Sequence, residues 1–255
     1  MSDEEKKKIS DTEAEYIFLK SYTCPVCENK LYVPTVKSGK TRMISQDWDL
    51  RPVFKNIDTV KYDVVHCNRC GYAALTRYYG VLAKPHKALL LEKIAANYNP
   101  IPEPGDSFTY ADALARYMLA LKNAEARLAH DSEKAMISIK IGWLYRGAKQ
   151  SLGDPDKMSP EDKANYDALD KKENEYLEKA MEGFIAARMN EAPPIAGMNE
   201  VVLDFLIAAL CSHFNRFEDA SRLIAGILQS KQASSQQKDK ARDMLAEMRE
   251  RMPKK

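Results

Sequence analysis

Four of the five cysteines in this chain stand as two C-x-x-C pairs, "CPVCEN" (Cys24 and Cys27) and "CNRCGY" (Cys67 and Cys70). A C-x-x-C pair on a tight turn directs both sulfurs towards one point, and two such turns supply the four thiolates of a tetrahedral zinc site. Gly71, just after the second pair, can adopt the positive φ that such a turn often needs. Because four protein thiolates leave no position open for water, the pattern predicts one structural zinc ion.

Other chemistry is less well supported by these residues. Two redox-active C-x-x-C pairs are the alternative, but such motifs lie between a strand and a helix in a βαβ pattern, which the surrounding sequence lacks. His66 precedes Cys67 and is a further potential ligand, yet four cysteines suffice, so we interpret it as a strand-end histidine. Cys211 lies in the apolar stretch "FLIAALCSHF". We expect a small buried residue there, and His213 faces another side of the helix, so the two form no nucleophile and base.

Composition and charge favour a globular protein with its thiols reduced. The chain has 255 residues, of which 45% are hydrophobic and 30% charged, and its net charge is +2. No apolar run approaches the roughly 18 residues that a membrane span needs, and the first residues, "MSDEEKKKISDTEAE", contain no apolar signal core. We therefore expect a cytoplasmic protein without a membrane partner, in which paired C-x-x-C motifs bind metal more often than they form disulfides.

The elements that must hold the cysteines change character along the chain. The first 15 or so residues are charged and predicted to be disordered, and we expect residues 1–19 to form a flexible segment. Between residues 20 and 83, "KLYVPTV" and "KYDVVHC" are typical of short strands. The 39 residues between the two pairs exceed the usual spacing of small zinc sites, so this zinc-ribbon-like module must carry an extra hairpin or a long loop.

From residue 84 to 255 the apolar pattern becomes helical. It predicts helices over about 84–98, 108–129, 130–150, 160–190, 200–213, 216–230 and 235–251. Asp131 or Ser132 is the expected N-cap of the third of these, and Ser159 with Pro160 opens the fourth. Ser234 with Gln237 is a candidate capping box for the last. The fold class is thus α+β and mainly α, with a small β module followed by an α-helical domain, and so two structural units.

The helical half has spacings of small and aromatic residues that favour stacked repeats. Ala180, Phe184 and Ala187 match the second helix of a tetratricopeptide repeat, and "IGWLYRG" with Gly142 and Tyr145 matches a first helix. A second candidate hairpin is "DFLIAALCSHFNRFEDASRLIAGIL", with Ala208 and Ala220 as its small positions. The alternative is an ordinary helical bundle. Stacked repeats offer a groove for a protein or peptide partner.

A basic stretch inside the β module has two interpretations. Residues 20–83 carry ten basic and five acidic residues, and four thiolates on one zinc ion would reduce the net charge of the module to about +3. One interpretation is a nucleic-acid or partner contact, with cations for phosphate and an aromatic ring for stacking. The residues are Lys37, Lys40, Arg42, Trp48 and Arg51. The other, which we favour, is a solvated hairpin with internal ion pairs in which Trp48 covers the small core.

The segments "SYTCPVCENKLYVPTVKSGKTRMISQDWDLRP" and "KYDVVHCNRCGYAA", with "IKIGWLYRG" and "FNRFEDASRLIAGIL", resemble the bacterial domain of unknown function numbered 2225. The resemblance covers nearly the whole chain after about residue 20. It implies a zinc ribbon joined to tetratricopeptide-like helices, with the two cysteine pairs as zinc ligands, and it implies no reaction. The second knuckle, "VHCNRCGYA", lacks a proline that the family often has there.

Three functions follow, in decreasing order of support. The first is a non-catalytic scaffold or adaptor with a zinc-stabilised module and a helical surface for protein binding. The second is a nucleic-acid-binding protein that uses the basic loop. An enzyme is the least supported, because the chain has only four histidines and no visible phosphate-binding glycine loop or open metal site. The sequence predicts neither the oligomeric state nor the identity of a partner.

Overall fold

The computed structural model describes residues 13–251 of the chain, and the fold is mainly helical. Within this range, six short strands form three separate antiparallel hairpins, and seven α-helices follow them. The predicted disordered start of the chain falls on residues 1–12 for the most part, which lie outside the described residues.

The three hairpins account for the unusual spacing of the cysteines. β1 (Ile17–Thr23) pairs with β2 (Lys30–Val36), β3 (Met43–Gln46) with β4 (Pro52–Phe54), and β5 (Val64–His66) with β6 (Ala73–Leu75). The C-x-x-C pairs occupy the turns of the first and third hairpins, and β3–β4 is the extra hairpin that the spacing predicted. Since Ile17 already pairs with Val36, the ordered β module begins before the predicted boundary at residue 20.

The helices lie close to their predicted positions. They are α2 (Lys84–Lys93), α3 (Tyr110–Ala126), α4 (Asp131–Ser151), α5 (Pro160–Asn190), α6 (Glu200–His213), α7 (Phe217–Gln229) and α8 (Ser235–Arg251). The local cap signals explain this agreement. Ser159 Oγ accepts a hydrogen bond from Asp162 N at 3.1 Å, and Ser234 and Gln237 form the predicted reciprocal pair at 2.9 and 3.2 Å.

The predicted cap of α4 is wrong. The helix begins at Asp131, and neither Asp131 nor Ser132 caps it with its side chain. Instead, the Ser132 N–H donates to Glu191 Oε1 at 2.9 Å, so a carboxylate just beyond the end of α5 satisfies the start of α4. A contact between residues 59 positions apart cannot be read from a local sequence pattern.

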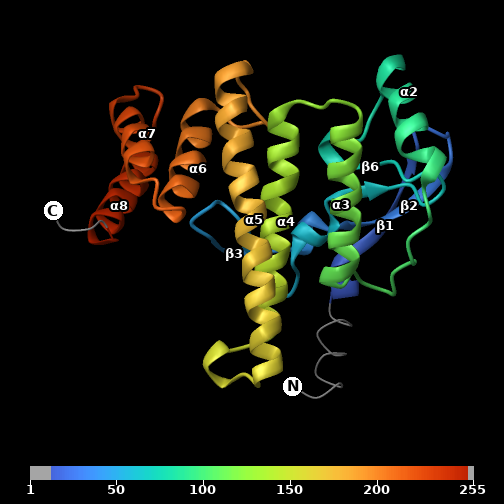
Figure 1. Ribbon diagram of the computed structural model, residues 1–255, viewed down its shortest axis with the longest axis horizontal. Helices are drawn as coiled ribbons and strands as arrows, with labels where there is room; N and C mark the ends of the chain where they lie inside the picture. The colour runs from blue at the N-terminus through green and yellow to red at the C-terminus, as the bar shows by residue number, and fades with distance from the viewer. Residues whose placement is uncertain (1–12, 252–255) are drawn as a thin grey trace.

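Helices α3 to α8 stand side by side in a row, with β1, β2 and α2 at the end of the row opposite α8 (Figure 1). α4 and α5 form the most extensive pair, and Gly142 allows their close approach, because a Cβ there would lie 2.8 Å from Leu177 Cδ2. The predicted small and aromatic positions Ala180, Phe184 and Ala187 are fully buried in α5. Ala208 in α6 and Ala220 in α7 are also fully buried.

One hydrophobic cluster joins part of the β module to helices α3 to α8, and the buried cysteines lie in a second cluster with residues of α2. Val60, Val64 and Leu75 from the β module belong to the same buried cluster as residues of α3 to α8. The hydroxyl of Tyr117 in α3 also donates to the Val60 carbonyl at 2.8 Å. The two predicted structural units are therefore packed together, so a change in the β module can alter the stability of the helices. None of the described helices combines the length and the apolar character needed to cross a bilayer.

Candidate metal centre

The two C-x-x-C turns have the same backbone hydrogen bonds. In the first, Cys24 N donates to Asn29 O and Glu28 N donates to Cys24 O, both at 2.9 Å. In the second, Cys67 N donates to Tyr72 O at 2.8 Å and Gly71 N donates to Cys67 O at 2.9 Å. The residue after each second cysteine has a positive φ, 62° at Glu28 and 73° at Gly71. Each turn thereby directs its two sulfurs to the same side.

The four sulfurs meet between the two turns. Cys24 Sγ lies 3.6 Å from Cys70 Sγ, Cys27 Sγ lies 3.6 Å from Cys67 Sγ, and all four ligand atoms lie within 4.8 Å of one another. A tetrahedral centre with zinc–sulfur bonds of about 2.3 Å places its sulfurs about 3.8 Å apart. All four cysteines are free thiols, and three of them are fully buried or nearly so. Their arrangement can hold one metal ion.

Protonation of the four thiols depends on their mutual hydrogen bonds. Bonding to Cys67 raises the pKa of Cys24 to about 11, whereas bonds to Cys24 and Cys70 lower the pKa of Cys67. Bonds to Cys24 and Cys67 raise the pKa of Cys70. One thiolate is thus favoured in the group, and a divalent cation that binds all four sulfurs must displace the other protons.

A tyrosine hydroxyl beside the sulfurs fits a metal–thiolate centre. The Tyr79 hydroxyl is buried and has no hydrogen-bond partner among the described residues. Burial, followed by the charge of the nearby Cys24 sulfur, raises the pKa of Tyr79. Since sulfur ligands of a metal commonly accept hydrogen bonds from neighbouring groups, an unpaired hydroxyl at this place is a suitable supporting donor.

The surrounding elements hold the second turn tightly. A Cβ at Gly71 would lie 2.3 Å from the ring of Tyr98, and Asn123 Nδ2 of α3 donates to Gly71 O at 2.9 Å. His66 is not part of the sulfur cluster; its Nε2 lies 2.8 Å from the Tyr98 hydroxyl, and burial lowers its pKa to about 4. The interpretation of His66 as a strand-end residue outside the ligand set agrees with this contact.

The five residues of the predicted nucleic-acid or partner contact differ in exposure and in their contacts. Lys40 and Arg42 are exposed, and Lys37 Nζ donates to the Glu15 carbonyl at 3.0 Å. Arg51 is buried, because its guanidinium bonds Asp58 Oδ2 at 2.9 Å and Gln150 Oε1 at 3.2 Å. Trp48 is 41% exposed but stacks on His213 of α6, with ring centroids 4.7 Å apart. Two of the five residues therefore fasten the β3–β4 loop to the rest of the molecule.

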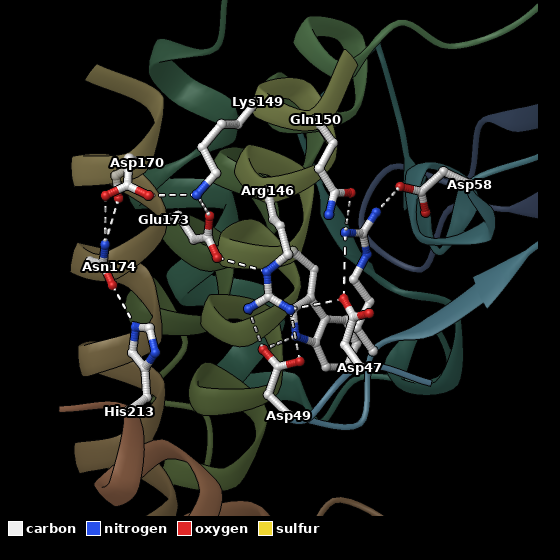
Figure 2. A network of polar contacts seen from close by, with 12 residues as sticks. Asp47, Asp49, Asp58, Arg146, Lys149, Gln150, Asp170, Glu173, Asn174 and His213 are labelled. Carbon is white, nitrogen blue, oxygen red and sulfur yellow. Dashed lines mark hydrogen bonds and ion pairs between the residues drawn. The ribbon is translucent and has the colours of Figure 1, made fainter. Parts of the chain in front are cut away.

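The sequence did not predict the buried polar network that surrounds Arg146 (Figure 2). Arg146 of α4 donates to both oxygens of Asp49, at 2.9 and 2.6 Å, and to Glu173 Oε1 of α5 at 2.7 Å. Asp49 has no exposed surface, and it also accepts from Trp143 Nε1 at 2.9 Å. The available signal in the sequence was Arg146, a single arginine in the apolar stretch "IGWLYRG". Its partner Asp49 lies 97 residues away, so the local pattern could not identify the pair.

The network continues to α6. Lys149 Nζ forms ion pairs with Glu173 Oε2 at 2.7 Å and Asp170 Oδ1 at 2.5 Å. Asn174 joins Asp170 to His213, whose Nε2 lies 2.7 Å from Asn174 Oδ1. Burial lowers the pKa of His213. Cys211, in the same helix, is fully buried, as predicted. The chain of contacts links the β3–β4 loop with three helices.

Comparisons with known proteins agree with this arrangement. Neither the curated proteins nor the solved structures gave a match to this chain. A family model described as "Uncharacterized protein conserved in bacteria (DUF2225)" matches residues 17–248, which include both cysteine pairs and nearly all of the described helices. The chain therefore belongs to the DUF2225 family of uncharacterized bacterial proteins.

Proposed function

We propose that this chain is a non-catalytic scaffold in which one structural zinc ion stabilises the β module and the helical half binds a segment of a protein partner. The ligand set supports zinc, because cysteine sulfur is a preferred ligand of this ion and four thiolates complete its coordination. A centre of this kind has no position for water or substrate. Its role is to hold the two turns together.

A cleft beside the β3–β4 loop is the observation that carries the binding proposal. It has a volume of about 370 Å³ and is bounded by that loop, α6 and α8. Five of its lining residues are apolar, among them Leu50, Phe205 and Met244, and the other eight are polar or charged, among them Lys240 and Glu247. A cleft that combines apolar walls with polar groups is a usual form of a binding site. Its size suits one or two apolar side chains of a peptide.

The β3–β4 loop is an example of the kind of segment that the helices can bind. Asp47, Trp48 and Asp49 lie against α4 to α6 through Arg146, Trp143 and His213. An extended segment of the chain is thus already bound across three helices, next to the open cleft. The stacked-repeat interpretation of the helices, which remains a prediction, supports the same type of partner.

Selection of peptides on the intact zinc-loaded protein tests the proposal. A random displayed library would be enriched on the full chain, and the Kd of a selected peptide measured by fluorescence anisotropy. Met244→Arg, which fills the cleft, should raise this Kd by about ten-fold or more. Met189→Arg makes the same change at an exposed position of α5 outside the cleft and should alter the Kd by less than about two-fold. Absence of enrichment, or equal Kd values for the two variants, would contradict the proposal.

A further inference from the structure

A buried arginine in α3 has no acidic partner. Arg116 is only 5% exposed, and its guanidinium lies over the ring of Phe108 at 4.4 Å. Its Nη1 donates to the Asp112 carbonyl at 2.8 Å, and no ion pair joins it to a carboxylate among residues 13–251. This differs from Arg146, which is equally buried but bonded to three carboxylates. A buried cation without a counter-charge is costly and is rarely retained for packing alone.

The arginine lines a cleft of about 210 Å³ beside the second cysteine turn. Val33 and Pro34 of β2 and the ring of Phe108 give this cleft apolar walls, and Arg69 adds a second cation. This cleft is separate from the one beside the β3–β4 loop, with which it shares no residue.

Three other polar side chains of the cleft are joined by hydrogen bonds, directly or through Tyr98. His66 bonds the Tyr98 hydroxyl, which donates to Asn68 Oδ1 at 2.7 Å. Asn68 Nδ2 donates to Glu103 Oε1 at 2.7 Å. Arg116 and the exposed Arg69 are the cations of the cleft for which the described residues supply no acid. The cleft therefore holds two guanidinium groups that no carboxylate of the described residues contacts.

Glu103 indicates the kind of group that this cleft attracts. It is an exposed carboxylate in the segment before α3, held at the edge of the cleft by Asn68. Burial lowers the pKa of Arg116, and the charges of Asp112 and Glu103 oppose that effect. The guanidinium thus already interacts at a distance with two carboxylates, and it forms an ion pair with neither.

We propose that this cleft binds a small organic oxyanion, with Arg116 as its direct partner and Arg69 as a second cation. The planar fork of a guanidinium matches the oxygens of a carboxylate or a phosphate group. The apolar walls would receive the organic part of the ligand. Burial strengthens such an interaction, because the local dielectric constant is low. The site would be independent of the peptide cleft, so it does not rest on the proposed scaffold function.

Calorimetric titration of the full zinc-loaded chain with inorganic phosphate, and separately with succinate, tests this site. Ionic strength is held constant with sodium chloride, because screening alone changes the affinity of charged ligands. Saturable binding of phosphate assigns a phosphate group, and saturable binding of succinate assigns a carboxylate. Either result supports the site if the variants behave as follows.

Arg116→Gln should weaken binding by about ten-fold or more, since it removes a charged hydrogen-bond donor. Glu103→Gln should strengthen binding several-fold, because it removes a competing negative charge. Arg69→Gln, at an exposed position, should weaken binding without disturbing the fold. Arg222→Gln, on α7 outside the cleft, should leave binding unchanged.

Three results would overturn the proposal. One is no saturable binding of either anion below about 10 mM, a weak limit even for small ligands. Another is binding that is the same in Arg69→Gln, Glu103→Gln and the unchanged protein, a comparison that holds even if Arg116→Gln fails to fold. The third is a folded Arg116→Gln variant that binds normally. In each case, Arg116 would have no role in binding an anion.

Discussion

Gly71 meets two requirements at the second cysteine turn that no other residue type can meet together. Its φ of +73° belongs to the left-handed region, and its Cα faces the Tyr98 ring so closely that a Cβ would overlap it. The matching position in the first turn is Glu28, which has the positive φ but no such neighbour in the structure. The two turns thus share a backbone but not an environment.

We predict that Gly71→Ala lowers the free energy of unfolding by more than about 2 kcal/mol, because left-handed strain of about 1–2 kcal/mol adds to the overlap with Tyr98. Urea unfolding measures this change. Gly105→Ala is the matched control, since a Cβ there meets no atom within 4 Å. A similar, small effect of both substitutions would show that the Tyr98 contact does not constrain the turn.

At the scale of residues, the sequence predicts what is local and misses what is distant. The clustering of the four cysteines was predicted because each pair is formed within four residues and both pairs share one motif. The contact of Arg51 with Gln150 was not predicted, because the two residues lie 99 positions apart in the sequence. The ion pair of Arg51 with Asp58 agrees with the favoured interpretation of internal ion pairs, whereas its burial against Gln150 of α4 was not expected.

Among the elements, the β3–β4 loop depends most on contacts with distant parts of the chain. Its Asp47 and Asp49 both bond Arg146 of α4, and Trp48 stacks on α6. The helices themselves were predicted closely because their caps and apolar periods are local. The position of this loop across α4, α5 and α6 could not be predicted, because it follows from a buried ion network between distant residues.

We predict that Arg146→Met lowers the free energy of unfolding by about 3–5 kcal/mol, because Asp49 then remains buried without its cation. Arg242→Met removes the exposed ion pair with Asp239 and should cost less than about 1 kcal/mol. In a double-mutant cycle, Arg146→Met with Asp49→Asn should cost less than the two single changes added together. Additive effects would mean that the two side chains do not depend on each other.

His213 should make the attachment of this loop sensitive to acid. Burial lowers its pKa below the ordinary value of about 6.5, so the unfolded chain takes up a proton there before the folded chain does. Stability is therefore lost as the pH falls through about 6.5. His213→Gln should lose less unfolding free energy than the unchanged protein between pH 7 and pH 5.5, with the difference at pH 8 as reference. Parallel pH profiles of the two proteins would contradict this.

For the molecule as a whole, the packing of the β module on the helices determines whether metal binding can stabilise more than the β module. The β module does not stand apart from the helices, because Val64, Ala73 and Leu75 lie in one cluster with α3 to α8. Two successive units were predicted from the change of period at residue 84. That change is real, but sequence periodicity reports which face of an element is buried, not which other element covers it.

The helical half also shows the limits of a repeat pattern. The small residues Gly142, Ala180 and Ala187 lie between packed helices, as the repeat pattern requires. A bundle places small residues at close helix contacts as well. The cleft between the β3–β4 loop and α8 was not predictable, since its walls come from segments about 200 residues apart in the sequence.

The most direct test of this account is the amount of zinc bound per chain after purification without added metal, measured by elemental analysis. We predict about one zinc ion per chain, its loss in Cys67→Ser/Cys70→Ser together with a lower stability of the whole molecule, and its retention in Cys211→Ser, which changes the cysteine outside the cluster. A chain without bound zinc, or a double variant as stable and as metal-loaded as the unchanged protein, would contradict the structural zinc centre.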